Sequence, residues 1–440
     1  MTLSQTPYRL SIDPALEGFR PEIEHVCGFL DDCYLLRRTP EAERVLHYGE
    51  QPPQNAVAIP AVLFPTGVRA DADGLHPQRD KLLEFVTAKE DGLLPPDESQ
   101  AVNRNFRYDA IGLIFFLLSR IEERDYPARD RYDRFPIAAA LIGPKDARLY
   151  PFADRAARDI AAALTGDPHP TPRTRYEVMF THDVDILKGY HRPFEPLRNA
   201  LGDLVKRMQP KTAWQRLRHA YFSGEPWHSM RRLMDISERY GIKSRFYFMG
   251  PSDDPMDSPY VLRWPALVRS VADEMRARGH VLGFHPGFYT FDNAVEWIRQ
   301  HDGIGAVIGS SVLEGRQHVL RYDAAITPRI WSDAGMTLDC TQAYPEVVGF
   351  RTGTCRPHHA YDLVGRHSLP LKQLSTAVME FGIFGGKYRD LPIEQAIADS
   401  VWAADQCREF GGTFALLFHT GQDEPRLWRW VEAVLEQAVH

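Results

Sequence analysis

The stretch 176–185, YEVMFTHDVD, decides the fold that we expect for this chain. An apolar run at 176–180 is followed at once by two carboxylates one residue apart, Asp183 and Asp185. In an extended segment this spacing points both side chains to the same side, about 6 to 7 Å apart along the chain. Two acids held so close need a cation or a proton between them. The pattern predicts a strand that ends at a metal site, with a turn capping the next helix as the plainer alternative.

Further apolar runs of strand length follow, separated by stretches with helical patterning. The runs are 244–249, 280–284, 312–320, 336–340, 377–384 and 413–418. The helical stretches between them include 233–240, 265–278, 328–334 and 393–410. This alternation predicts an α/β fold, built as a parallel sheet or as a closed α/β barrel. In a barrel, catalytic groups gather at the carboxyl ends of the strands.

Chemically active residue types lie at the ends of these runs. His285 follows the third run, Arg316 and His318 lie in the fourth, Asp339 lies at the end of the fifth, and His419 follows the last. Taken singly, each could be a loop, core or ion-pair residue. Their coincidence at successive strand ends predicts that they belong to a single catalytic site.

Length and composition narrow the classes of protein to which this chain can belong. With 440 residues, 44% of them hydrophobic, the chain can bury a large core, and two or three domains are expected. The net charge of -7 argues against general nucleic-acid binding, which needs a basic surface. The five cysteines are scattered, as expected for reduced thiols. We see no signal peptide and no transmembrane segment, and therefore expect a cytoplasmic protein.

A proline-rich segment at 166–173, GDPHPTPR, is the best candidate for a domain boundary. Closely spaced prolines stiffen a loop and block helix continuation. We therefore predict a smaller N-terminal accessory domain of mixed α/β structure and unknown role at 1–172. The second predicted domain, at 173–440, carries all the chemistry described above.

Five motifs resemble the polysaccharide deacetylases, carbohydrate esterase family 4, and in particular a divergent bacterial branch of that family. They are THDVD at 181–185, GHVLGFHP at 279–286, RQHVLR at 316–321, GFRTGTC at 349–355 and LLFHTG at 416–421. The resemblance covers about residues 174–440. It implies a distorted (β/α)7 barrel, and the stretch 108–126 resembles the domain that accompanies this branch.

The resemblance also implies roles for five of the residues. Asp183 would be the general base, Asp185 and His285 would be metal ligands, Arg316 would orient the base, and His419 would be the general acid. In the family an aspartate on an earlier strand holds the acid histidine, and Asp339 is the positional candidate here.

One position departs from the family pattern. The usual second motif has another histidine four residues after the first, and Tyr289 stands there in this chain. A catalytic zinc site needs three protein ligands and an open position. We nominate His318 as the third ligand. The competitors are His280, Tyr289, His358 and His359, and water alone is a further alternative for completing the shell.

Substrate-binding candidates are Arg351, Tyr289 and Trp214. Arg351 lies in GFRTGTC, and an ion-pair role is its alternative. Trp214 lies in an insertion at 188–232 that is rich in Lys, Arg and aromatic residues. Such a segment could hold a phosphorylated or lipid-linked sugar by phosphate contacts and ring stacking. A solvated helical pair with a buried aromatic stripe explains the same pattern.

The leading hypothesis is a metal-dependent hydrolase that removes an N-acetyl or related acyl group from a sugar in a bacterial glycan or glycoconjugate precursor. The divalent ion would be Zn²⁺, with Co²⁺, Ni²⁺ or Fe²⁺ suiting the same carboxylate and imidazole donors. Two alternatives stay open. One is a catalytically silent glycan-binding barrel, for which Tyr289 is the best support, and the other is a related barrel glycosidase.

Overall fold

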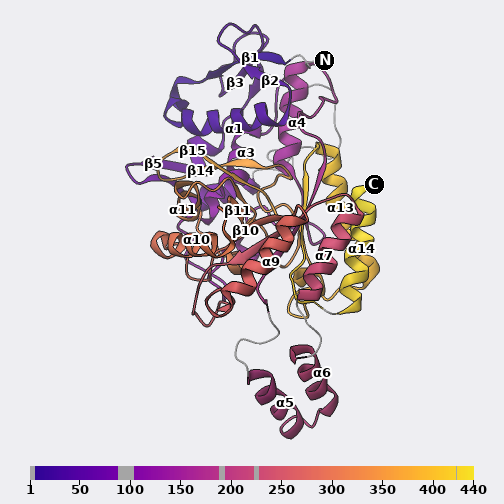
Figure 1. Cartoon of the computed structure of the whole chain (residues 1–440). Helices are drawn as coiled ribbons and strands as arrows, with labels where there is room; N and C mark the ends of the chain where they lie inside the picture. The colour runs from indigo at the N-terminus through magenta and orange to yellow at the C-terminus, as the bar shows by residue number, and fades with distance from the viewer. Residues whose placement is uncertain (1–4, 88–103, 188–193, 222–226, 423) are drawn as a thin grey trace. The chain divides into compact units, whose positions relative to one another are not determined.

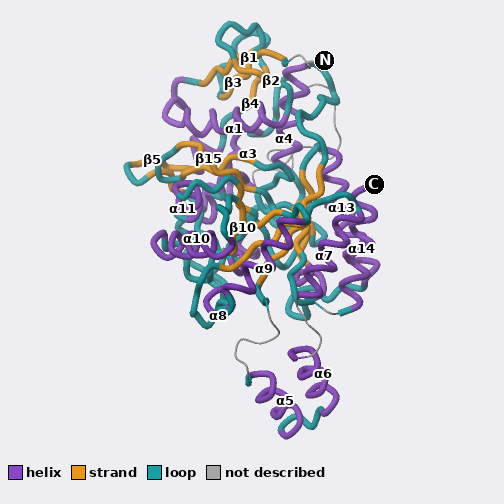
Figure 2. Tube along the Cα trace, in the orientation of Figure 1, coloured by secondary structure: helices purple, strands orange, loops and turns teal. Residues whose placement is uncertain are grey.

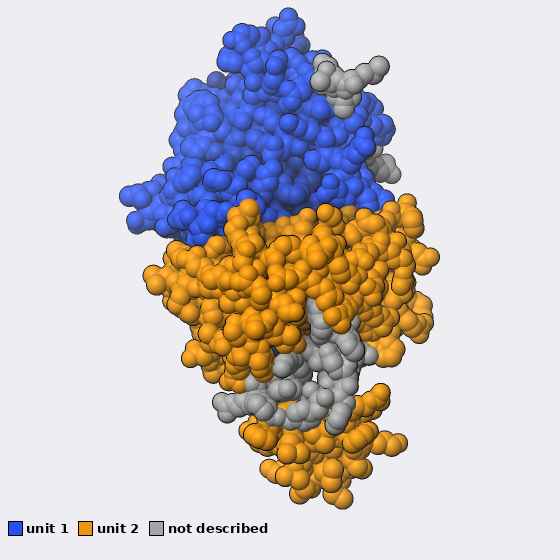
Figure 3. All heavy atoms as spheres, in the orientation of Figure 1, with its two compact units in different colours: residues 1–177, 320–378, 402–414 blue, residues 178–319, 379–401, 415–440 orange. Residues whose placement is uncertain are grey.

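The structure is a computed structural model that describes residues 5–87, 104–187, 194–221, 227–422 and 424–440. It divides into two compact units, coloured separately in Figure 3. The first unit comprises Met1–Glu177, Leu320–Val378 and Trp402–Phe414, and the second comprises Val178–Val319, Met379–Val401 and Ala415–His440. The chain thus enters the first unit three times, and the boundary at 172/173 stays a prediction.

Six neighbouring strands of a larger sheet belong wholly or partly to the second unit, and Figure 2 draws the strands in orange. These six run in the order β11-β10-β9-β8-β17-β16, and β8 pairs with β9, β9 with β10, and β10 with β11 in parallel. Parallel strands bring their carboxyl ends to one edge, where loop residues can meet. The strands are β8 Glu177–Val184, β9 Ser244–Met249, β10 Val281–His285, β11 Glu314–Gly315, β16 Val378–Met379 and β17 Thr413–Leu417.

Helices with local start and stop signals accompany these strands (Figure 1). The side chain of Asn293 accepts a hydrogen bond from Glu296 N at the start of α10, and Gly309 ends that helix with a φ of 72°. Proline opens α9 and α14, where its missing N–H costs no helical hydrogen bond. The helices are α7 Trp227–Arg239, α8 Tyr260–Arg263, α9 Pro265–Ala277, α10 Ala294–Ile308, α12 Glu380–Phe384, α13 Ile393–Phe410 and α14 Pro425–Val439.

A helical hairpin precedes α7 in the chain. It consists of α5 Glu195–Val205 and α6 Pro210–Tyr221, which pack against each other. Among the described residues, no helix is both long enough and apolar enough to cross a membrane.

The first unit is built around α3 Ala110–Ser119, in which every residue is buried. Asp109 caps this helix, since its carboxylate accepts hydrogen bonds from Gly112 N and from the buried Tyr48 hydroxyl. A parallel sheet of order β2-β1-β3-β4 belongs to this unit. Its strands are β1 Thr6–Ile12, β2 Leu36–Arg38, β3 Val45–Tyr48 and β4 Val57–Ile59.

Other elements of the first unit are short or come from the later passages of the chain. Strands β5 and β6 form a hairpin, and β7 pairs with β13. Strands β14 and β15 pair antiparallel, and β12 pairs with β15 in parallel. The bounds are α1 Arg20–Cys33, β5 Val68–Asp71, β6 Gly74–Pro77, α2 Arg79–Thr87, β7 Arg148–Leu149, α4 Phe152–Thr165, α11 Thr327–Asp333, β12 Leu338–Asp339, β13 Val348–Gly349, β14 His358–Asp362 and β15 His367–Gln373.

The predicted α/β class is confirmed, but a closed seven-stranded barrel is not, because the described strands form open sheets. The strands predicted at 176–180, 244–249, 280–284 and 413–418 are present as β8, β9, β10 and β17. The runs at 312–320, 336–340 and 377–384 each contain only a two-residue strand. Short apolar runs do not distinguish a strand from other buried backbone, which explains these three differences.

Candidate metal centre

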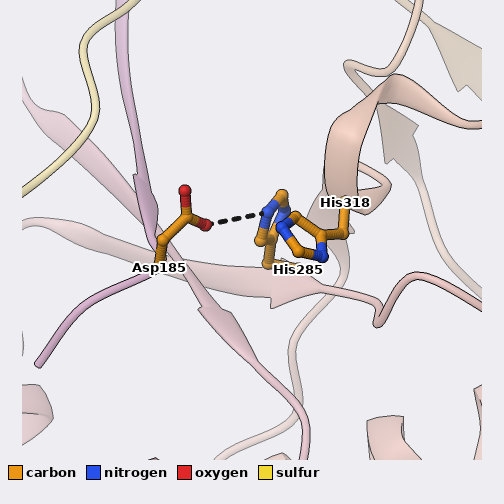
Figure 4. Close-up of side chains that lie close together, drawn as sticks. All are labelled: Asp185, His285 and His318. Carbon is orange, nitrogen blue, oxygen red and sulfur yellow. Dashed lines mark ion pairs between the residues drawn. The ribbon is translucent and has the colours of Figure 1, made fainter. Parts of the chain in front are cut away.

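Asp185, His285 and His318 lie together in the second unit (Figure 4). Each offers one ligand atom, and these atoms all lie within 4.8 Å of one another. Asp185 follows β8, His285 is the last residue of β10, and His318 opens the short 3-10 turn His318–Leu320. Asp185 Oδ1 is 3.3 Å from His285 Nε2. Three segments that are distant in sequence thus direct a carboxylate and two imidazoles to one point.

The Nδ1 atom of each imidazole has a partner that orients the ring. His285 Nδ1 lies 2.6 Å from the carbonyl oxygen of Arg316, to which it donates. His318 Nδ1 lies 2.8 Å from Asp257 Oδ1, which also accepts a hydrogen bond from Phe288 N. In a neutral imidazole with its proton on Nδ1, Nε2 is the atom that binds a metal. Both rings therefore have the orienting partner that metal-binding histidines have, with Nε2 as the atom that each can offer to an ion.

The backbone between β11 and His318 is positioned by close packing on β10. A Cβ at Gly315 would overlap the carbonyl oxygen of Phe284, so only glycine allows this approach. Arg316 N donates to that same carbonyl oxygen at 3.1 Å. Val319 has a φ of 58°, a conformation that β-branched residues rarely adopt. This strained backbone lies directly after His318, and strain of this kind concentrates at functional sites.

The donor set fits a divalent ion. Asp185 Oδ1 is shielded from solvent and, among the described residues, contacts His285 Nε2 as an ion pair without a regular hydrogen bond, although its side chain is partly exposed. Burial alone would raise the pKa of Asp185, but the histidines around it, His285 first, hold that pKa below its usual range. One carboxylate with two imidazoles leaves a tetrahedral ion an open coordination position, as catalytic zinc sites do.

Asp183 lies beside this cluster and is held by an ion pair. Arg316 Nη1 donates to Asp183 Oδ1 at 2.6 Å, and Arg316 Nη2 donates to Thr181 Oγ1 at 2.9 Å. Both members of the pair are buried. The second oxygen, Asp183 Oδ2, lies 4.0 Å from His285 Nε2 and 3.9 Å from His419 Nε2. The ion pair thus fixes which carboxylate oxygen faces the cluster.

His419 approaches the cluster from the other side, and Glu380 holds it. Its Nδ1 lies 2.6 Å from Glu380 Oε1, which also accepts a hydrogen bond from His419 N at 2.9 Å. Burial would lower the pKa of His419, but the charge of Glu380, with Asp185 and Asp183, raises it to about 9. The imidazole is therefore protonated at neutral pH and directs its Nε2–H towards the two aspartates, with Nε2 3.9 Å from an oxygen of each.

Asp339 does not hold His419, so that prediction is wrong. Its carboxylate accepts hydrogen bonds from Thr341 N at 2.8 Å and from Gln373 Nε2 at 3.1 Å, within the first unit. Glu380 occupies the place on His419 instead. It opens α12 inside a run that was expected to be a strand. A single acid in the apolar stretch 377–384 is the sequence signal that could have identified it.

Arg351 also has a different setting from the one predicted. Its guanidinium donates to both carboxylate oxygens of Glu123, at 3.1 and 2.7 Å, and to the carbonyl oxygen of Ala343. Both charged side chains are buried within the first unit. These are the contacts of a structural ion pair, so Arg351 is not retained as a substrate-binding residue.

The histidines that compete with His318 have other partners. His280 Nδ1 accepts a hydrogen bond from Ser244 N, and its Nε2 lies 3.2 Å from Glu238. His358 and His359 belong to β14 in the first unit. Tyr289 is 55% exposed and is not part of the three-residue cluster.

Trp214 lies on α6 and is 62% exposed. The assignments of Trp214 and Tyr289 to substrate binding stay predictions. Parts of the insertion at 188–232, namely 188–193 and 222–226, lie outside the described residues.

Asp257 was not identified from the sequence. It lies in the loop after β9 and binds His318 through a contact that spans 61 positions of the chain. A Cβ at Gly287 would overlap Asp257 Oδ2, so the glycine of the HPG sequence at 285–287 makes room for this carboxylate. The sequence around Asp257, SDDPMDSP, is acidic but contains no motif that indicates a carboxylate holding a metal-binding histidine.

Comparisons with known proteins give a partial match. A protein-family model, "Family of unknown function (DUF7033)", matches residues 32–166. No curated protein matches the chain. Among solved structures, a protein assigned as a polysaccharide deacetylase from Mycobacterium smegmatis has 19% identity and a TM-score of 0.40, with 60% of this chain and 84% of that one covered.

Two further structures are similar at lower scores. A mutant of a CE4 family pseudoenzyme with restored activity has 11% identity and a TM-score of 0.25, with 56% of this chain and 67% of that one covered. A peptidoglycan N-acetylglucosamine deacetylase in complex with a benzamide ligand has 13% identity and a TM-score of 0.24, with 60% and 79% covered. At these identities and TM-scores, the likeness to deacetylases assigns no activity to this chain.

Proposed function

We propose that this chain is a metal-dependent hydrolase that removes an N-acetyl or related acyl group from an amino sugar. The observation that supports it most is the close grouping of three functional sets in one unit. These are a donor set for a divalent ion, an aspartate held by a buried arginine, and a histidine held by a buried glutamate. Metal-dependent amide hydrolysis uses all three, because water must be activated and a poor leaving group must be protonated.

Asp185, His285 and His318 would hold the ion, with Zn²⁺ as the first choice and Co²⁺, Ni²⁺ or Fe²⁺ suiting the same donors. A bound divalent ion supplies Lewis-acid chemistry, which makes water more acidic and polarises the acyl oxygen. Asp257 and the carbonyl of Arg316 act through the histidines, since they fix the ring orientation and the tautomer.

Asp183 is the proposed general base. Arg316 holds Asp183 Oδ1, so Oδ2 is the oxygen left towards His285 and His419. That oxygen would take the proton of the attacking water. The buried guanidinium compensates the carboxylate charge without occupying the reactive oxygen.

His419 is the proposed general acid. Glu380 binds Nδ1, so the proton available for transfer is on Nε2, which faces the two aspartates. With its pKa raised to about 9, the imidazolium persists at neutral pH and can protonate the departing amine. The substrate class follows from the motif resemblance. The exposed rings of Tyr289 and Trp214 are candidates for stacking on the apolar face of a sugar.

The test combines metal analysis with acetate release from N-acetylated nucleotide sugars and short glycans. Asp183→Asn should lower turnover by about 100-fold or more while metal stays bound. Asp185→Ala should lose the metal, because it removes the only carboxylate of the donor set. Asp302→Asn, an exposed position on α10, is the matched control and should change neither property.

Two results would count against the hydrolase. Full activity after complete metal stripping would exclude a metal-dependent reaction. Metal and sugar binding without acetate release from any substrate would instead favour the catalytically silent glycan-binding alternative.

A further inference from the structure

The α5–α6 hairpin carries an unusual apolar surface on α5. Leu197, Leu201, Leu204 and Val205 are each at least 52% exposed. They are spaced four, seven and eight residues after the first, which places them on one face of the helix. We call these four residues the apolar stripe. Met208, just after the helix, and Trp214 on α6 are also large, apolar and exposed.

The apolar stripe lies outside the buried residues that the structure describes in this hairpin. On α5 the buried residues are Pro196, Ala200 and Asp203, and on α6 Ala213 is buried. Among the described side chains of the two helices, the buried ones are thus small or polar, whereas the four residues of the apolar stripe stay at least half exposed. An amphipathic helix of a globular protein ordinarily buries its large apolar side chains. Contiguous apolar surface of this kind marks an interaction site.

The hairpin is also basic, in contrast to the chain as a whole. Residues 195–221 contain six Lys or Arg and two acids, a net charge of +4, whereas the whole chain has a net charge of -7. One of the two acids, Asp203, is already paired with Arg207. The basic residues are Arg198, Lys206, Arg207, Lys211, Arg216 and Arg218.

We infer that the α5–α6 hairpin docks the protein on an anionic phospholipid surface. An interfacial helix combines an exposed apolar face with basic residues, so that aliphatic side chains enter the acyl boundary while cations meet the headgroups. A second copy of the chain is a less suitable occupant, because pairing two apolar stripes would bring two hairpins of charge +4 together. The inference goes beyond the proposed hydrolysis and does not depend on it.

The experiment measures cosedimentation of the full chain with phosphatidylcholine vesicles, prepared with and without phosphatidylglycerol, at low and high salt. We expect binding only to vesicles with phosphatidylglycerol, and weaker binding at high salt, because salt screens the headgroup attraction. Leu201→Ser combined with Leu204→Ser should weaken binding by about 10-fold or more. Lys206→Glu combined with Lys211→Glu should weaken it similarly.

Control variants carry changes of the same kind outside the hairpin. Val295→Ser removes an 80% exposed aliphatic side chain from α10, and Lys81→Glu reverses a charge on α2. Both should bind vesicles like the unchanged protein. Thermal unfolding of every variant checks that the fold is intact.

Three outcomes would overturn the inference. They are equal binding to both kinds of vesicle, unchanged binding of the two hairpin variants, and a concentration-dependent dimer that the Leu201→Ser, Leu204→Ser variant abolishes. The last would identify a second copy as the occupant. Acetate release from a water-soluble substrate is assayed separately, so failure of membrane docking and failure of the proposed hydrolase are distinguishable.

Discussion

Asp257 and Glu380 each hold one histidine of the candidate site by its Nδ1 atom, and the two carboxylates have opposite consequences. Asp257 lies beside His318, whose other nitrogen belongs to the proposed donor set, so it favours a ring with its lone pair towards the ion. Glu380 raises the pKa of His419 and so favours a ring that carries a proton. The same kind of contact thus serves a ligand at one position and an acid at the other.

The change Asp257→Asn tests the first of these contacts. Asparagine keeps the shape and can still accept hydrogen bonds, but it removes the negative charge beside His318. We expect the affinity for Zn²⁺ or Co²⁺ to fall by about 10- to 100-fold, measured by competition with a chromophoric chelator. Asp254→Asn is the control, since that side chain accepts a hydrogen bond from Met256 N in the same loop. Unchanged metal affinity in Asp257→Asn would show that the charge of Asp257 does not act on the metal through His318.

At the scale of elements, the site depends on how closely β11 approaches β10. Only two residues of β11 are paired, and Phe284 faces Gly315 in the register. From this point Arg316 reaches Asp183, and His318 reaches the ligand cluster. The segment is further tied down by Gln317, whose Nε2 donates to Gly287 O and to Thr290 Oγ1. Close packing of Gly315 on Phe284 therefore positions the side chains of Arg316 and His318, although β11 is only two residues long.

Gly315→Ala should displace this segment. The new methyl group would overlap the backbone oxygen of Phe284, which cannot move aside as a flexible side chain could. We expect a loss of about 1 to 3 kcal/mol in the free energy of unfolding, and weaker metal binding, measured by denaturant titration and metal competition. Gly28→Ala in α1 meets no neighbouring atom and should be neutral or stabilising by up to about 1 kcal/mol. Equal behaviour of the two variants would refute the proposed close packing.

At the scale of the whole molecule, three buried histidines in the two units link stability to pH. Burial lowers the pKa of His25 and His182 to about 3, and that of His358 to about 4. For His182 of the THDVD sequence, burial outweighs the hydrogen bond that Nδ1 donates to the carbonyl of Phe418, a contact that by itself raises the pKa. Its Nε2 lies 2.9 Å from Ser244 Oγ. All three are therefore neutral structural residues. Both ring nitrogens of His182 contact Phe418 and Ser244, so it is not a metal ligand although it directly precedes Asp183 in the sequence.

These lowered pKa values predict that the free energy of unfolding falls as the pH falls. Each histidine has a folded pKa below its unfolded value of about 6.5, so its contribution is complete above that pH and is lost as the pH falls towards 4 and then 3. Each adds a slope of up to about 1.4 kcal/mol per pH unit to the free energy of unfolding in that window. Denaturant titrations from pH 7.5 to 4.5 measure it. His25→Phe should make the profile less steep, and an unaltered slope would contradict the assignment.

Local patterns in the sequence are sufficient to predict many of the strands and two of the proposed metal ligands of the second unit. The strands β8, β9, β10 and β17 could be predicted because each is a buried run bounded by polar or turn residues. Asp185 and His285 could be nominated because each directly follows or ends such a strand. These features depend on neighbours in the chain, which is the information that a single sequence contains.

Other features are decided only by tertiary structure. Contacts between residues 34 to 228 positions apart are the clearest examples. They are His318 with Asp257, His419 with Glu380, Arg351 with Glu123, and Asp339 with Gln373. The division into units is of the same kind, because the chain returns twice to the first unit. Local sequence determines where a strand ends and which residue type stands there. Packing of distant segments determines which carboxylate meets which base, because any buried charge must find a partner wherever the fold supplies one.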